Sequence, residues 1–139
     1  MSGKVLQWVG EWLTGRQQRV VINGKASTWE DIQSGVVQGS VLGPCLFLIY
    51  INDIDGAVED LDGFLRKFAD DTKWAKKIFG EQDRNDFQKG LDKLMQWADA
   101  WQMEFNKDKC HIIHLGRNNN RYQYTMGVYS LLLPSLRKT

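Results

Sequence analysis

The strongest constraint on the fold is a stripe of apolar residues in the second half of the chain, spaced like one face of a helix. The spacings run four, three, four, three and four, which matches the repeat of an α-helix. We expect the helix to end at Asn106. Because a helix with a single apolar face needs a partner that covers it, the chain must supply a second layer. The members of the stripe are Phe87, Leu91, Leu94, Ala98, Trp101 and Phe105.

A β-hairpin over residues 64–78 is the predicted partner of this helix. Two aromatic residues, Phe68 and Trp74, anchor its strands, and an aspartate pair at 70–71 lies at or near its turn. A further strand is expected over residues 109–115, where the character of the side chains alternates. This order of strand, helix and strand predicts a two-layer α+β domain, an antiparallel sheet with helices packed on one face.

The first part of the chain predicts smaller elements. Apolar residues at helical spacing over 5–13 indicate a short helix that Gly15 ends. A strand over 18–22 runs into Asn23-Gly24, a dipeptide typical of tight hairpin turns, and a returning strand is expected over 27–32.

Residues 34–44, SGVVQGSVLGP, form a predicted loop because they hold three glycines and one proline. Pro44 suits the first turn of a helix, where its missing N–H costs nothing, and this helix is expected to continue through Ile54. Glycines let a backbone approach a flat ligand closely, and Gln38 offers both a donor and an acceptor. Taken alone, the segment is better explained as an ordinary glycine-rich loop.

Composition indicates a globular chain. Its 139 residues are enough for one compact domain, and 42% of them are hydrophobic. No apolar run approaches the roughly 20 residues that cross a bilayer, and the N-terminus lacks the apolar stretch of a secretion signal. Cys45 and Cys110 are expected to be buried free thiols, which fits an intracellular protein of the cytoplasm or nucleus without a membrane partner.

Charge is nearly balanced, with 18 Lys and Arg against 17 Asp and Glu, a net charge of +1. This balance argues mildly against a stand-alone nucleic-acid binder. Five basic residues nevertheless flank the aspartate pair, and they form either a solvated charged face or a source of charge for phosphate oxygens. They are Arg66, Lys67, Lys73, Lys76 and Lys77.

Asp70 and Asp71 are adjacent carboxylates at a predicted turn, so they repel one another unless a cation compensates. A hard ion such as Mg²⁺, with Mn²⁺ as an alternative, fits because it binds through one or two carboxylates and keeps water and phosphate ligands. Adjacent aspartates alone are a weak signal, because solvated turns often contain them.

Three motifs, in this order, resemble the reverse transcriptases of non-LTR (LINE-type) retrotransposons. Residues 34–44 resemble that family's template- and nucleotide-contacting motif, and FADD at 68–71 resembles its metal-binding motif. The next motif has a lysine near the incoming triphosphate, and NKDKC at 106–110 resembles it, with Lys109 as the best match. The similarity runs from about Val5 to Gly127, and the three motifs are highly specific as a set.

The resemblance implies a palm-like polymerase domain over residues 1–127, with incomplete fingers and no thumb, and a divergent tail over 128–139. It implies that Asp70 and Asp71 are catalytic ligands of Mg²⁺ or Mn²⁺. The partners it implies are an RNA template, a DNA primer and a dNTP, and the oligomeric state stays open. Residues expected to bind nucleotide or template are Gln38, Gly39, Ser40, Phe68, Ala69 and Lys109.

The mechanism that the resemblance implies needs more carboxylates than this pair. In it two Mg²⁺ ions about 3.5–4 Å apart serve nucleotidyl transfer, and a third aspartate on an earlier strand helps to hold them. Asp70 and Asp71 supply one side only, so we expect no polymerase activity, or very little, from this chain alone. Val37 also stands where the family usually has proline.

The alternative is a non-enzymatic remnant of a retroelement that binds RNA or a protein partner. Trp97 and Trp101 could stack on bases in such a remnant, although their place on or beside the apolar stripe favours packing in the core. His111 and His114 are three apart on a predicted strand and would face opposite sides, so they are poor joint metal ligands.

Overall fold

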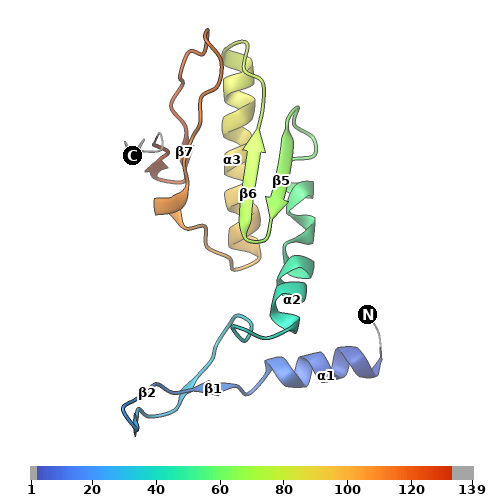
Figure 1. Cartoon of the computed structure of the whole chain (residues 1–139). Coiled ribbons are helices and arrows are strands. Elements are labelled where there is room, and N and C mark those ends of the chain that lie inside the picture. Colours follow the sequence, from blue (N-terminus) through green and yellow to red (C-terminus); the bar gives the residue numbers. More distant parts are fainter. Residues whose placement is uncertain (1–2, 133–139) are drawn as a thin grey trace. The chain divides into compact units, whose positions relative to one another are not determined.

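The chain divides into two units, Met1–Ile49 and Tyr50–Thr139, called here the first and the second unit. The structure, a computed structural model, describes residues 3–132 of the chain. Most of its buried apolar residues belong to the second unit, which carries the helix and the hairpin that the sequence predicts (Figure 1).

Helix α3, Glu81–Ala100, is the predicted amphipathic helix. At its start, the backbone N–H groups of Phe79 and Gly80 donate to the carboxylate of Asp83, at 2.9 and 3.2 Å. A carboxylate in the first turn also suits the positive end of the helix dipole. The beginning of α3 is therefore fixed by its own sequence.

The end of α3 corrects the prediction, because the helix stops at Ala100 and not near Asn106. Gln102 adopts a φ of +53°, and the N–H of Met103 donates to the carbonyl of Ala98 at 2.8 Å. This is the Schellman arrangement that closes many helices, here with glutamine at the position that usually holds glycine. Residues beyond it leave the helix axis.

Strands β5, Phe64–Phe68, and β6, Asp71–Ala75, form the predicted antiparallel hairpin. Side chains of a strand alternate between two faces. Leu65 and its cross-strand partner Trp74 lie on the inner face, where they join the core residues contributed by α3. The hairpin and α3 thus pack on one another in the second unit through their apolar faces.

Two clusters of buried residues make the core of the second unit, and α3 contributes to both. The first cluster is Ile54, Val58, Leu65 and Leu94. The second is Phe87, Leu91, Tyr124 and Met126. Phe105 lies beyond the end of α3 and still packs against both clusters, which explains why it fitted the apolar stripe.

Helix α2, Leu42–Tyr50, is followed by the 3₁₀ helix η1, Asn52–Ala57. Pro44 lies in the first turn of α2, as predicted. One helix running through Ile54 was expected, and this is wrong, because the N–H of Ile54 bonds to the carbonyl of Ile51 at 3.3 Å in the tighter 3₁₀ pattern. The change of winding still places Ile54 in the core.

The predicted strand over residues 109–115 does not form. Lys107–Lys109 is a 3₁₀ turn, η2, and one isolated parallel bridge joins His111 to Leu132. Ile112 is half-buried against the second cluster, so the alternation of side chains is real. It does not produce a strand because no neighbouring strand pairs along it within the described residues.

Strands β7, Thr125–Met126, and β8, Tyr129–Ser130, form a short hairpin that Gln88 of α3 holds. The Gln88 amide donates to the carbonyl of Thr125 at 2.9 Å and accepts from the N–H of Thr125 at 3.0 Å. It therefore bonds to this edge as the backbone of another strand would. β8 falls within the residues that the sequence assigns to the tail.

The first unit contains helix α1, Lys4–Leu13, as predicted. Between β2 and β3, Asn23 has a φ of +50° and Gly24 a φ of +78°, which is the hairpin turn that Asn-Gly predicts. The predicted strands over 18–22 and 27–32 form only in part, because each observed strand has two residues and the returning chain already pairs at Lys25–Ala26, before the predicted range. The chain here forms two short strand pairs. They are β1, Gln17–Gln18, with β4, Glu30–Asp31, and β2, Val21–Ile22, with β3, Lys25–Ala26.

The strands do not join into the single sheet that was expected. Each of the four strand pairs in the described residues is its own two-stranded antiparallel sheet. The fold that residues 3–132 show is therefore a mixture of helices and antiparallel strands. Both cysteines are free thiols, but Cys45 is exposed and Cys110 only half-buried, so the expectation that both are buried is wrong.

Candidate functional site

The aspartate pair lies at the closed end of the β5–β6 hairpin. Phe68 pairs with Asp71, which leaves Ala69 and Asp70 as the two turn residues. Ala69 has a φ of +51°, in the left-handed region that costs a residue with a side chain roughly 1–2 kcal/mol. A two-residue turn with positive φ at its first position usually has glycine there. The prediction that the aspartates sit at the turn is confirmed.

Both carboxylates of the pair are exposed, and neither has a hydrogen-bond or ion-pair partner among residues 3–132. Free carboxylate oxygens are the donors that Mg²⁺ accepts while it keeps water ligands, so Asp70 and Asp71 fit such an ion as part of its ligand set. No group of three or more His, Cys, Asp and Glu side chains in the same residues is placed to hold a metal. The pair is an incomplete set of ligands.

Two of the five basic residues near the pair are committed to other parts of the second unit. The ammonium of Lys67 lies 2.9 Å from the carboxylate of Asp55. The side chain of Lys76 is 2% exposed, and its ammonium donates to the carbonyl of Asp62 at 2.8 Å. These two lysines hold the fold together and are not free to meet a phosphate.

Two of the other basic residues, Arg66 and Lys73, lie on the outer face of the hairpin. Arg66 lies directly opposite Lys73 in the register, and like charges in that position destabilise a sheet unless an anion screens them. The guanidinium of Arg66 also lies 5.4 Å from the centre of the Phe64 ring. Phe68 shares this face and is 82% exposed. The prediction that Phe68 anchors its strand is therefore wrong.

Trp74 anchors the inner face, as predicted. Its ring is stacked on Phe87 of α3 at 6.0 Å between centroids. A Cβ at Gly63 or Gly90 would come within 2.5 or 2.8 Å of the indole, so both positions need the absence of a side chain. This contact fixes how the hairpin lies on α3.

Lys109 ends the 3₁₀ turn η2 of the second unit and is exposed. Among the described residues, no hydrogen bond or ion pair joins its ammonium to another group. Its neighbour Lys107 lies over the ring of Tyr129, with the ammonium 4.4 Å from the ring centre. Within that part of the chain Lys109 is therefore a free cation, whereas Lys107 is held.

The glycine-rich loop belongs to the first unit, whereas the aspartate pair belongs to the second. Gly39 has a φ of +77°, and Gln38 beside it is exposed. The hydroxyl of Ser40 donates to the carbonyl of Val37 at 2.7 Å and accepts from the N–H of Gly43 at 3.0 Å, so it caps the start of α2. Ser40 was predicted to bind nucleotide or template; in the structure its hydroxyl forms this cap.

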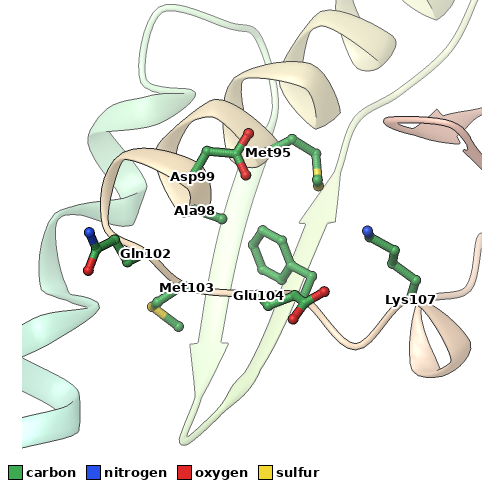
Figure 2. A pocket seen from close by; sticks show the side chains of 8 residues that line it. Met95, Ala98, Asp99, Gln102, Met103, Glu104 and Lys107 are labelled. Carbon is green, nitrogen blue, oxygen red and sulfur yellow. The ribbon is translucent and has the colours of Figure 1, made fainter. Parts of the chain in front are cut away.

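A surface pocket of about 320 Å³ lies beside the end of α3 and was not foreseen (Figure 2). The residues predicted to bind nucleotide or metal do not line it. Sequence reasoning missed it because the chain there was expected to continue as a helix. Its lining consists of Met95, Ala98, Asp99, Gln102, Met103, Glu104, Phe105 and Lys107.

The two tryptophans at the end of α3 differ in their surroundings. Trp97 packs against the first cluster, and its indole N–H donates to Asp53 at 3.2 Å. Trp101 follows the last helical residue, is exposed, and meets Tyr50 edge to face at 5.5 Å. Packing in the core is therefore confirmed for Trp97 only.

A model of the reverse transcriptase (RNA-dependent DNA polymerase) family matches residues 2–129. The chain therefore belongs to the reverse transcriptase family. Over 110 residues it is 33% identical to the RNA-directed DNA polymerase from mobile element jockey of Drosophila melanogaster, a match that covers 73% of this chain and 12% of that relative. The corresponding polymerase of Drosophila funebris is 32% identical over 116 residues, with 79% and 13% covered.

A third relative is the probable RNA-directed DNA polymerase from transposon X-element of Drosophila melanogaster. It is 34% identical over 101 residues, 70% of this chain and 11% of the relative. The chain thus spans about an eighth of the length of these relatives. The matches confirm the resemblance to reverse transcriptases of LINE-type retrotransposons. No solved structure matches the chain, and no described helix is long and apolar enough to cross a membrane.

Proposed function

We propose that this chain is part of the palm of an RNA-directed DNA polymerase and that Asp70 and Asp71 bind its catalytic divalent metal. The observation that carries the proposal is the pair of exposed carboxylates at the turn of a hairpin packed on α3. Within the described residues, neither carboxylate forms an ion pair with a basic side chain. Membership of the reverse transcriptase family supports it, since that family works on nucleic acids with divalent metals. In the proposal, residues 1–127 form the partial palm and 128–139 a divergent tail.

When bound, two Mg²⁺ ions would supply activation of the 3′-hydroxyl of a DNA primer and neutralisation of the triphosphate of a dNTP. Asp70 and Asp71 would hold the ions through one oxygen or more each. The exposed ammonium of Lys109 would meet the triphosphate oxygens, and Gln38 and Gly39 would contact the nucleotide or the RNA template. Phe68 and Ala69 of the second unit would also contact nucleotide or template.

The ligand set limits what the described residues can do alone. Two adjacent carboxylates hold one side of a two-metal site, and residues 3–132 contain no cluster of three ligands. We therefore expect weak binding of Mg²⁺ or Mn²⁺ by the chain and little or no primer extension on an RNA template. Extension that depends on Asp70 would contradict this expectation.

The test of the metal site is a titration of Mn²⁺, followed by its electron paramagnetic resonance signal, and of Mg²⁺ by calorimetry. Asp70→Asn and Asp71→Asn should each weaken metal binding by at least about tenfold. Mutation of a residue that only hydrogen-bonds to a metal ligand already lowers metal affinity by about 10–100-fold. Asp99→Asn is the matched control, since Asp99 is also an exposed aspartate of the second unit. Equal affinities for all four proteins would overturn the metal site.

A second candidate function is binding of single-stranded RNA without catalysis. The outer hairpin face favours it, because two exposed aromatic rings, Phe64 and Phe68, flank the opposed cations Arg66 and Lys73. Bases stack on such rings while cations follow the phosphates. The two candidates differ in their need for metal, since this binding would persist when a chelator removes every divalent ion.

A further inference from the structure

An acidic segment, residues 53–62, precedes the hairpin in the chain and forms ion pairs with the hairpin and with α3. Three of its aspartates each reach one lysine of another element. On β5, Lys67 meets Asp55; on α3, the ammonium of Lys93 lies 2.6 Å from both carboxylate oxygens of Asp60. Just after β6, Lys76 meets Asp62 at 3.5 Å. The segment therefore holds both ends of the hairpin by ionic contacts.

Lys67 is the most completely bonded of these lysines. Besides the ion pair with Asp55, its ammonium donates to the carbonyl of Asn52 at 3.0 Å and lies 3.4 Å from that of Ile51. An ammonium has three N–H donors, so each has one acceptor here. The side chain is 20% exposed, which reduces the competition from water. Its position is fixed by three groups.

Lys67 lies close to the aspartate turn, so its bonds restrict the movement of that turn. Lys67 pairs with Thr72, next to the closing pair of Phe68 and Asp71. Its side chain leaves β5 on the inner face, opposite to Phe68. Beyond it, no side chain of the turn bonds to the rest of the described residues, and Phe68 points to solvent. Lys67 is therefore the last residue of β5 before the aspartates whose side chain bonds to another element.

We propose that Lys67 is a positioning residue that holds the Asp70–Asp71 turn in place by tying β5 to the 3₁₀ helix η1; its effect on metal binding rests on the function proposed above. It does not touch the metal or the substrate. It limits the directions in which the two carboxylates can move, so that both can reach one ion. Order in a binding site reduces the entropy lost on binding.

The test compares Lys67→Met with Lys93→Met in the full chain. Each variant keeps an aliphatic stem and loses one ion pair with the same acidic segment, and only the first lies beside the turn. Hydrogen exchange of the backbone amides of residues 66–72 should speed up in Lys67→Met by about tenfold more than in Lys93→Met. Lys67→Arg keeps the charge and should restore part of the protection, because its planar guanidinium fits the three acceptors of the ammonium less well.

Metal affinity provides the second measurement. We expect Lys67→Met to weaken Mn²⁺ binding by about 10-fold, within the range known for residues that orient metal ligands. Lys93→Met should bind Mn²⁺ like the unaltered chain. Asp55→Asn replaces the partner and keeps both carbonyl acceptors, so it should give a smaller effect in the same direction, and it serves if Lys67→Met does not fold.

The outcomes separate the two proposals. If the unaltered chain binds no Mn²⁺, the proposed metal site fails, and exchange at the turn still decides the role of Lys67. If the chain binds Mn²⁺ and the two methionine variants show the same exchange and the same affinity, the role of Lys67 is rejected. That role is rejected as well if Asp55→Asn leaves both quantities unchanged.

Discussion

The packing of Trp74 depends on two glycines, which leave room for its indole because they have no side chain. The indole lies against Gly63 of the preceding loop and Gly90 of α3, and stacks on Phe87. Glycine inside a helix normally weakens it by about 1 kcal/mol relative to alanine. At position 90 glycine is nevertheless the better residue, because a Cβ there would lie 2.8 Å from the indole nitrogen of Trp74.

Gly90→Ala should therefore destabilise the second unit, although alanine is the better helix former. The indole has to move away from α3, and such overpacking costs about 1–3 kcal/mol. Urea unfolding followed by circular dichroism measures the change. Gly56→Ala is the control, because nothing lies within 4 Å of a Cβ at that position. Equal stability of the two variants would contradict the clamped position of Trp74.

One ion pair of the acidic segment, between Asp60 and Lys93, makes the second unit sensitive to pH. The ammonium of Lys93, hydrogen-bonded to Asp60, lowers the pKa of that carboxyl below its ordinary value of 3.8. A pKa that is lower in the folded chain than in the unfolded one stabilises the fold above the unfolded value. The contribution disappears as the pH falls through the folded value.

The difference in melting temperature between the unaltered chain and Asp60→Asn should accordingly stay constant from neutral pH down to about pH 4. It should shrink at lower pH, where Asp60 becomes protonated in the unaltered chain as well. Thermal unfolding at a series of pH values measures it, and using the difference removes the effect of other carboxylates. A difference that persists unchanged at pH 2 would contradict the role of this pair.

Local sequence predicted the elements whose determinants lie within a few residues. The stripe beginning at Phe87 identified α3, and Asn23-Gly24 and the aspartate pair identified two turns. The end of α3 was missed because it depends on Gln102, whose left-handed conformation no residue preference announces. The bends after α2 and the unpaired stretch 109–115 were missed because tertiary contacts decide them.

Of the candidate site, the sequence predicted the turn that carries the two aspartates but not the roles of their basic neighbours. Lys67 and Lys76 look equivalent to Lys73 in the sequence, and only their partners across the fold distinguish them. Phe68 and Trp74 likewise look similar, although one faces solvent and the other the core. Which face a strand buries depends on the layer beneath it.

Across the whole chain the net charge is only +1, so any binding of RNA must come from a local surface. Phe68→Ala should weaken binding of a single-stranded RNA by about 1–3 kcal/mol, the value of one stacked base. Phe79→Ala is the matched control, because Phe79 is 86% exposed and lies outside the hairpin. Fluorescence anisotropy in the presence of a chelator measures both, and equal loss in both variants would exclude the hairpin face.

The two units differ greatly in how much they bury. Among residues 3–49 only Val9 and Gly43 are buried, whereas the second unit holds two apolar clusters. The first unit also leaves Trp8 and Trp29 more than half exposed. Stability measured on the chain therefore reports mainly the second unit, in which the aspartate turn lies.

The contact between Trp74 and α3 also provides the molecule with an internal optical reporter. The indole N–H of Trp74 is buried without an acceptor in the described residues, and the ring is stacked on Phe87. Such an indole emits at shorter wavelength than one in water. Departure of the hairpin from α3 would shift this emission to the red. In a variant that keeps Trp74 and replaces the other five tryptophans, movement of the strands on either side of the aspartate turn can be followed without any attached dye.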